Sequence, residues 1–286
     1  MRPKNLNAKI FLDGSDTEQT KTLLGLLGFL DGQTTNPSNF ASSPEVAARI
    51  ARGEKFSQGQ AFAEYRKRVS EISNLLPDGA ISVEVYADPT TTAAAMFKQG
   101  QEMFAWVPNA YVKYPTTAAG LEAAQRSVAE GMRVNMTLVF TQAQAAAVYA
   151  ATKGAKRGDV FISPFIGRLN DRGQNGINLI ENVIKMYQQG DGHVLVLTSS
   201  IRTVRQFTQA LAIGTDCITA YFAAIEDWGK QGMPLPDRST FADEGLNPIT
   251  YQSLELNRNW QEYDIRHELT DKGMERFTND WNALIE

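Results

Sequence analysis

The chain has 286 residues, of which 43% are hydrophobic and 21% charged, which is typical of a globular protein with a sizeable core. Lys and Arg total 28 against 32 for Asp and Glu, and the net charge of -4 argues against a nucleic-acid or acidic-membrane partner and favours a small-molecule ligand. No window reaches the ~18 uninterrupted apolar residues of a membrane span, and residues 1–7 contain no apolar signal region, so we expect a cytoplasmic protein.

The chemistry must come from side chains other than the usual metal ligands. Cys217 is the single cysteine, so no internal disulfide can form, and its apolar neighbours predict a buried thiol. His193 and His267 are the only histidines, so we expect neither a zinc site nor a Ser/His/Asp triad, and we predict no metal and no cofactor.

Short apolar runs alternate with helix-like runs along the first 230 residues. The runs expected as strands are 8–12, 28–32, 80–85, 109–113, 132–138, 159–163, 193–198 and 215–219. Helices are expected at 16–27, 44–52, 57–75, 90–103, 117–130, 141–152, 173–189, 202–212 and 220–230. Eight such units over residues 1–230 predict a (β/α)8 TIM barrel. The main alternative is an open doubly wound sheet, but no strand is followed by the glycine-rich phosphate turn of those sheets.

Residues 231–286 are predicted to form a C-terminal helical extension. They begin with a stretch rich in Pro, Gly and Asp, and they end in a helix with one apolar stripe, formed by Met274, Phe277, Trp281 and Leu284. Such a stripe must be covered. We expect the extension to pack on the barrel or on a partner subunit, and in the second case the chain forms a homo-oligomer, most simply a dimer.

Polar side chains fall on one face of several predicted strands. In residues 81–85, Ser82 and Glu84 alternate with apolar residues, which places them on the opposite side of the strand. The same alternation gives an inward set that also contains Asp13, Lys113, Asn135, Thr137, Ser163 and Phe165. Burying charges and amides is unfavourable unless they satisfy one another, so their convergence near the carboxyl ends of the strands predicts an active site. The alternative is a structural ion pair between Glu84 and Lys113.

Lys113 ends the apolar run 109–113, where loss of water favours the neutral amine that attacks a carbonyl to form a Schiff base. A lysine that extends from the strand end into solvent is the alternative. Two further cations, Arg168 and Arg202, follow predicted strands, and guanidinium groups together with the Ser200 hydroxyl suit a phosphate dianion. Either arginine taken alone is more often a surface residue.

Seven segments resemble the transaldolase family and occur in that family's order. They are IFLDGSD (10–16), DGQTTNPS (31–38), ISVEV (81–85), YVKYPTTAAG (111–120), NMTLVFTQAQA (135–145), ISPFIGR (162–168) and TSSIR (198–202). The resemblance implies the barrel fold and an enzyme of the non-oxidative pentose phosphate pathway. Such an enzyme transfers a dihydroxyacetone unit from sedoheptulose 7-phosphate or fructose 6-phosphate to glyceraldehyde 3-phosphate or erythrose 4-phosphate through a lysine Schiff base.

The resemblance also implies roles for individual residues. Lys113 would form the imine, Asp13 would take the proton from the carbon 4 hydroxyl, and Glu84 with Thr137 would hold a water that relays protons. The residues expected to bind the substrate are Asn36, Asn135, Ser163 and Phe165 for the three-carbon fragment and Arg168, Ser200 and Arg202 for the phosphate. Asp31 is a second acid near a predicted strand end, and we expect it to be structural, capping the turn at 34–38.

Two other functions remain as alternatives. A fructose-6-phosphate aldolase of the same superfamily releases free dihydroxyacetone, and those enzymes resemble one another in having Gln in place of Glu84 and Tyr in place of Phe165. An extra phenol could help a water quench the enamine, and Phe165 cannot, so transfer is favoured. A non-catalytic sugar-phosphate-binding barrel would be expected to lose Lys113 or Asp13, and both are present.

Overall fold

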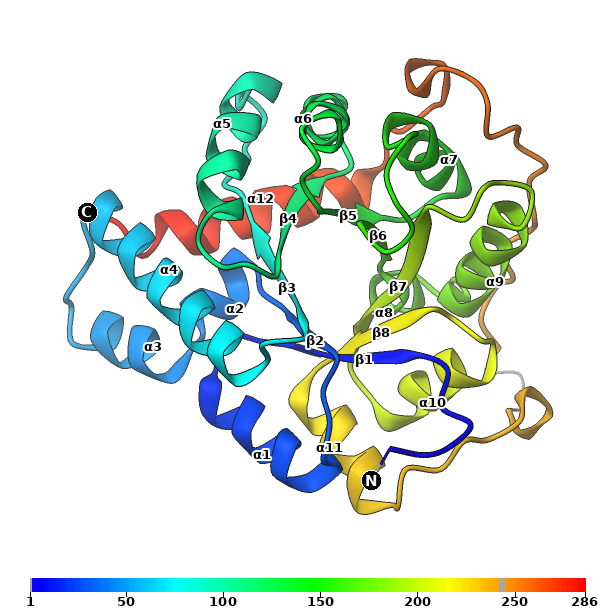
Figure 1. Ribbon diagram of the computed structural model, residues 1–286, viewed down its shortest axis with the longest axis horizontal. Coiled ribbons are helices and arrows are strands. Elements are labelled where there is room, and N and C mark those ends of the chain that lie inside the picture. Colours follow the sequence, from blue (N-terminus) through cyan, green and yellow to red (C-terminus); the bar gives the residue numbers. More distant parts are fainter. Residues whose placement is uncertain (1, 242–244) are drawn as a thin grey trace.

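The structure is a computed structural model that describes residues 2–241 and 245–286. Within these residues, eight parallel strands close into a barrel in the order of the sequence (Figure 1). They are β1 (Lys9–Asp13), β2 (Gly32–Thr34), β3 (Ala80–Glu84), β4 (Ala110–Pro115), β5 (Val134–Val139), β6 (Val160–Pro164), β7 (Val194–Ile201) and β8 (Cys217–Ala220). The predicted (β/α)8 barrel is confirmed, and the open doubly wound sheet is wrong.

The helices surround the barrel on its outer face (Figure 1). Those that match the predicted segments are α1 (Thr17–Leu27), α3 (Pro44–Ala51), α4 (Gln58–Leu75), α5 (Ala93–Phe104), α6 (Ala118–Ala129), α7 (Gln142–Ala151), α9 (Gly176–Tyr187), α10 (Val204–Ala212) and α11 (Phe222–Lys230). Four begin after a threonine whose hydroxyl accepts a hydrogen bond from the first turn: Thr92, Thr117, Thr141 and Thr203. No helix of residues 2–241 and 245–286 has the length and apolar character needed to cross a membrane.

The second strand does not lie where the sequence predicted it. The prediction was 28–32, but β2 spans Gly32–Thr34. Gly28 instead ends α1, with a φ of 76° and an N–H that donates to the Leu24 carbonyl at 2.9 Å, so the apolar residues after it form a loop. A Cβ at Gly32 would overlap the carbonyl of Ala80, so glycine allows β2 to approach β3.

The barrel interior is filled by a cluster separate from the core between strands and helices. It consists of Phe11, Phe161, Leu195, Leu197 and Cys217, with Tyr111 packed against it and stacked on Phe161. Cys217 is fully buried, as predicted, and burial raises the pKa of its thiol. Because these side chains fill the barrel, the inward residues two positions later on β1, β4 and β6 lie nearer its open end.

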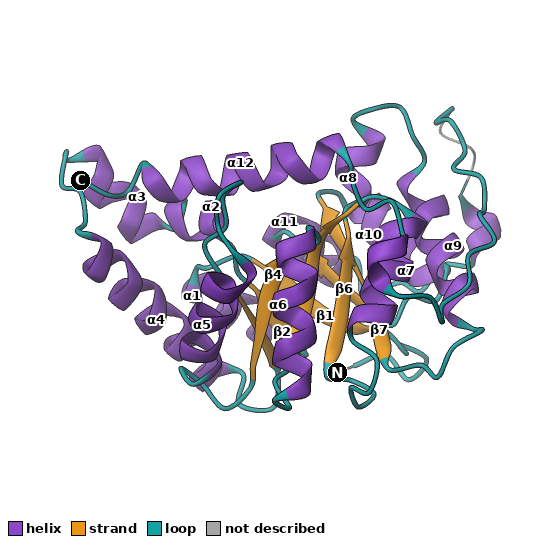
Figure 2. Ribbon diagram, turned by 90° about the horizontal axis from the view of Figure 1, so that it is seen from above, coloured by secondary structure: helices purple, strands orange, loops and turns teal. Residues whose placement is uncertain are grey.

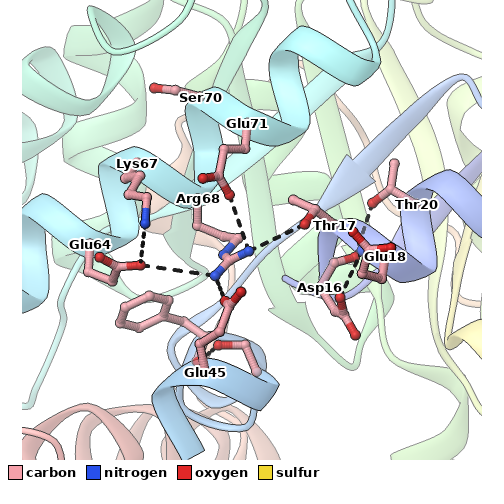
Figure 3. Close-up of polar contacts among 12 residues, drawn as sticks. Asp16, Thr17, Glu18, Thr20, Glu45, Glu64, Lys67, Arg68, Ser70 and Glu71 are labelled. Carbon is pink, nitrogen blue, oxygen red and sulfur yellow. Dashed lines mark hydrogen bonds and ion pairs between the residues drawn. The ribbon is translucent and has the colours of Figure 1, made fainter. Parts of the chain in front are cut away.

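A buried arginine joins three helices on the flank of the barrel (Figure 3). Arg68 of α4 forms ion pairs with Glu45 of α3 and with Glu71, the latter at 3.2 Å, and it lies 4.0 Å from Glu64. Its guanidinium also donates to the Thr17 hydroxyl at the start of α1. The surrounding carboxylates compensate the burial of the charge, so α1, α3 and α4 are held together by polar as well as apolar contacts.

Two short helices, α2 (Pro37–Ala41) and α8 (Ile166–Asn170), were not predicted, and with α12 (Glu268–Asn282) they lie at one end of the barrel (Figure 2). The α12 helix runs across that end, and its apolar stripe is buried. Trp281 packs against Phe40 of α2, and the Thr270 hydroxyl donates to the Leu138 carbonyl of β5 at 2.9 Å. In this arrangement α12 covers the carboxyl ends of the strands.

Candidate active site

A charged pair lies inside the barrel. Lys113 Nζ is 2.9 Å from Glu84 Oε2, and each side chain is only 4% exposed. The strand register pairs Glu84 with Lys113 and Lys113 with Asn135, which places the three residues on adjacent strands. Nζ also donates to the Thr35 carbonyl at 3.3 Å. The lysine is therefore buried rather than extended into solvent.

The second carboxylate, Asp13, ends β1. Its Oδ1 accepts hydrogen bonds from Asn39 Nδ2 at 2.7 Å and from the Thr34 hydroxyl at 3.2 Å. Burial raises the pKa of Asp13 more than Lys113 and these two donors lower it. Burial likewise raises the pKa of Glu84 against the opposing effect of Lys113, and the charge of Asp13 raises it further. Carboxyl groups whose pKa is raised by burial are better bases than exposed ones, which suits them to proton exchange with a bound substrate.

Polar groups beside the pair are buried and only partly satisfied. The Ser163 hydroxyl donates to Asn135 Oδ1 at 2.7 Å, and Asn135 Nδ2 donates to the Ser82 hydroxyl at 3.0 Å. In contrast, Thr137 Oγ1 is buried with no hydrogen-bond partner in the described part of the chain, and Glu84 Oε2 has no partner there other than its ion pair with Lys113. An unpaired buried polar atom costs about 1–3 kcal/mol, so both oxygens are suited to a further hydrogen bond with a bound water or substrate.

A cavity of about 930 Å³ opens at the barrel mouth. The predicted site residues that line it are Asp13, Asn36, Phe165, Arg168, Ser200 and Arg202. The other predicted site residues, Lys113, Glu84, Asn135, Thr137 and Ser163, are buried deeper in the barrel. The structure thus brings both sets together at one end, with the buried acid–base residues below a cavity that is lined by three arginines and three aspartates. Asn36 also begins α2, where its side-chain oxygen accepts from the Asn39 N–H at 2.8 Å.

A glycine allows the predicted phosphate-binding residues to meet. A Cβ at Gly167 would overlap the Ser200 carbonyl, so α8 packs directly on the end of β7 and brings Arg168 close to Arg202. Ser200 has a φ of 59°, which is uncommon outside glycine and coincides with a shift in the pairing of β7 with β8. Arg202 makes two hydrogen bonds to Asp171, at 2.9 and 2.8 Å. Its guanidinium is therefore held in position by a carboxylate within the cavity wall.

A model of the transaldolase/fructose-6-phosphate aldolase family matches residues 10–286. This chain belongs to that family. It is 32% identical to the probable transaldolases of Dehalococcoides mccartyi, Roseiflexus sp. and Thermus thermophilus, over 96% of this chain in each case and 99%, 97% and 99% of those proteins. The predicted family resemblance is confirmed, and the chain is an enzyme of the transaldolase type.

Among solved structures, the 3-hexulose-6-phosphate synthase of Salmonella typhimurium superposes with a TM-score of 0.48 and 11% identity, covering 76% of this chain and 89% of that one. That likeness is too remote to support an argument about the transaldolase-family site.

Several residues of this transaldolase-family cavity were missed from the sequence, and two of them, Arg276 and Tyr221, bear on substrate binding. Arg276 of α12 lines the cavity, and its charge, with that of Arg202, adds to the desolvation that lowers the pKa of Arg168. Arg276 flanks the predicted apolar stripe, but no motif connects it with Arg168 and Arg202, which lie far earlier in the sequence. Tyr221, which directly follows β8, also lines the cavity. The only signal for it was its position at a strand end.

Asp31 makes structural contacts, but it does not cap the turn at 34–38 as the sequence predicted. Asp31 precedes β2 rather than following it, and its carboxylate accepts from the Ile10 N–H at 2.8 Å and pairs with Arg2 at 2.8 Å. The turn at 34–38 is instead capped by Asn36. The error arose because the second strand was placed four residues too early, which moved Asp31 to the wrong end of the barrel.

Proposed function

We propose that this transaldolase-family enzyme transfers a dihydroxyacetone unit from sedoheptulose 7-phosphate or fructose 6-phosphate to glyceraldehyde 3-phosphate or erythrose 4-phosphate, as in the non-oxidative pentose phosphate pathway. A Schiff base at Lys113 carries the unit. The observation that supports this most directly is a buried lysine 2.9 Å from a carboxylate, below a cavity lined by Asp13, by two further aspartates and by three arginines. These are the groups that imine formation, proton abstraction and phosphate binding require.

Imine formation begins with deprotonation of Lys113. Glu84 Oε2 lies close to Nζ, and the raised pKa of Glu84 allows it to accept a proton from the ammonium group. The neutral amine adds to the ketone at carbon 2, and the resulting carbinolamine loses its hydroxyl as water. A water held between Glu84 and Thr137 would deliver the proton that this step needs, and it would satisfy both buried oxygens.

Cleavage of the carbon 3–carbon 4 bond requires a base at the carbon 4 hydroxyl. Asp13 takes that proton, the bond breaks, and its electron pair moves toward the iminium to form an enamine as the aldehyde leaves. In the second half of the reaction the enamine carbon attacks the acceptor aldehyde, Asp13 returns the proton, and hydrolysis of the imine releases the new ketose. Asn36, Asn135 and Ser163 would hydrogen-bond the three-carbon fragment, and Phe165 would form an apolar wall beside it.

The phosphate would bind at the other side of the cavity. Arg168, Ser200 and Arg202 converge there, and Arg276 adds a further positive charge. Guanidinium groups bind a phosphate dianion through paired, charge-assisted hydrogen bonds. Arg202 would share its donors between the phosphate and Asp171.

Two measurements test the proposal. Borohydride reduction in the presence of fructose 6-phosphate should attach a three-carbon adduct to the enzyme, and peptide mass mapping should place it on Lys113. An adduct at another lysine, or none, contradicts the Schiff-base assignment. Fructose 6-phosphate mixed with erythrose 4-phosphate should yield sedoheptulose 7-phosphate, whereas release of dihydroxyacetone without the seven-carbon product would favour the aldolase.

A further inference from the structure

Tyr221 is an aromatic residue left exposed in the active-site cavity. Three large apolar or aromatic side chains are exposed in the described part of the chain, and they are Leu26, Tyr221 and Leu235. Of these, Tyr221 is 41% exposed and lines the cavity. Its hydroxyl has no hydrogen-bond partner within residues 2–241 and 245–286. An aromatic ring with a free polar tip in a concave site is suited to contact a ligand.

The strand register places Tyr221 between two residues of the proposed mechanism. Strands β7, β8 and β1 are neighbours in the barrel (Figure 1). Aligned residues of these strands are Ile201, Ala220 and Leu12. All three belong to the core between strands and helices. Because side chains alternate, the residues that follow, Arg202, Tyr221 and Asp13, are directed toward the barrel mouth at the same level. The backbone N–H of Tyr221 also donates to the Ile201 carbonyl at 3.1 Å, which fixes its position beside β7.

The charges around the phenol agree with this placement. Partial desolvation of the phenol in the cavity wall and the charge of Asp13 raise the pKa of Tyr221, while Arg202, Arg276 and Arg168 oppose the shift. The phenol thus lies in the field of both the carboxylate and the arginines. A phenol that stays protonated at neutral pH both donates and accepts a hydrogen bond, as a sugar hydroxyl does.

We propose that the Tyr221 hydroxyl binds the sugar hydroxyl on the carbon between the aldehyde carbon and the phosphate-bearing end. This inference rests on the proposed function, in which Asp13 contacts the reacting oxygen and Arg202 the phosphate. The carbon chain of the aldehyde must span the distance from Asp13 to Arg202, and Tyr221 lies between these two residues. For glyceraldehyde 3-phosphate the group in question is the carbon 2 hydroxyl. Tyr221 is thereby a specificity-determining residue for the aldehyde.

The test compares two acceptors of equal length on the full chain and on Tyr221→Phe. Glyceraldehyde 3-phosphate carries the hydroxyl, and 3-phosphooxypropanal lacks it. With sedoheptulose 7-phosphate as donor, kcat/KM for the acceptor reports only the reaction of the enamine with that acceptor. We expect Tyr221→Phe to lower kcat/KM about 5- to 10-fold for glyceraldehyde 3-phosphate and less than about 2-fold for the deoxy compound. Tyr251→Phe is the matched control, since the Tyr251 hydroxyl contacts Gln189 and lies outside the cavity, and it should change neither value.

Each other outcome overturns the inference. An equal loss for both acceptors would mean that the hydroxyl serves only the packing of the ring, and an unchanged preference would mean that it does not contact the sugar. A change confined to release of free dihydroxyacetone would assign the phenol to water rather than to the acceptor. Borohydride trapping distinguishes failure of the proposed function from failure of the role of Tyr221. If the unmodified enzyme forms no adduct at Lys113, both proposals fail. If both enzymes form the adduct but discriminate equally, only the role of Tyr221 fails.

Discussion

Replacing Lys113 with Met should destabilise the protein by an amount that depends on pH. The substitution leaves the Glu84 carboxylate buried without the ammonium group that lies 2.9 Å from it. At an effective dielectric constant of about 20, the attraction between unit charges at that separation is about 6 kcal/mol. Loss of one partner of a buried ion pair costs about 3–5 kcal/mol, less than the full attraction because the remaining group can take up a proton.

The direction of the pH dependence follows from the pKa of Glu84. Burial already raises this pKa above 4.5, and removing Lys113 takes away the interaction that lowers it most. A carboxyl whose pKa is raised on folding binds its proton more tightly in the folded state than in the unfolded state. The free energy of unfolding therefore falls as pH rises from the pKa of the unfolded state to that of the folded state. The destabilisation of Lys113→Met should therefore be largest at pH 8 and much smaller at pH 5.

Thermal unfolding at the two pH values, followed by circular dichroism, measures the effect. A loss of 3–5 kcal/mol corresponds to a fall in Tm on the order of 10 °C at pH 8. Adding Glu84→Gln removes the unpaired charge, so the double variant should recover most of that loss at pH 8 and show little pH dependence. An equal fall at pH 5 and pH 8, or no recovery in the double variant, would refute the argument that an uncompensated carboxylate causes the loss.

Four further outcomes are expected. Gly100→Ala should lower stability by about 1–3 kcal/mol in urea unfolding, because the new Cβ overlaps the Tyr114 hydroxyl, and a smaller loss is expected in a Tyr114→Phe background. Thr137→Val should reduce kcat about 100-fold without lowering Tm, since the lost hydroxyl is buried and has no protein partner in the described residues; a large fall in Tm would indicate a structural role. The acid limb of kcat/KM should lie above pH 3.8, because activity is lost as pH falls through the raised pKa of Asp13, and a limb below that value would exclude Asp13 as the base. Arg276→Ala should raise KM for glyceraldehyde 3-phosphate about 10-fold but leave KM for unphosphorylated glyceraldehyde unchanged, and equal changes would argue against phosphate binding.

The side-chain placements that the sequence predicted correctly depend on local patterns. Glu84 and Lys113 meet inside the barrel because each occupies the inward set of an alternating strand, and alternation can be counted without knowing the neighbouring strand. The starts of four helices also depend on local sequence, since the threonines at 92, 117, 141 and 203 accept hydrogen bonds from N–H groups in the first turn of the helix that each precedes.

The parts that were missed depend on contacts between distant segments. The β2 strand has only three residues, and pairing with β1 and β3 rather than its own composition makes it a strand. The helices α2 and α8 have five residues each, which is too short to show a helical period. Arg276 reaches the cavity because α12 packs across the end of the barrel. The amphipathic pattern of a helix predicts that its apolar face is buried, but it does not identify the surface that buries it.

With Tyr221 in its proposed role, the alignment of Leu12, Ala220 and Ile201 ties the choice of aldehyde to the register that closes the barrel. A single-residue insertion or deletion within β8 would turn Tyr221 toward the helices and present a neighbour of opposite parity to the sugar. A change in the length of β8 should therefore alter the choice of aldehyde even where the barrel still folds. New aldehyde preferences are accessible instead through point substitutions at the positions just after the aligned row, which leave the closure of the sheet untouched.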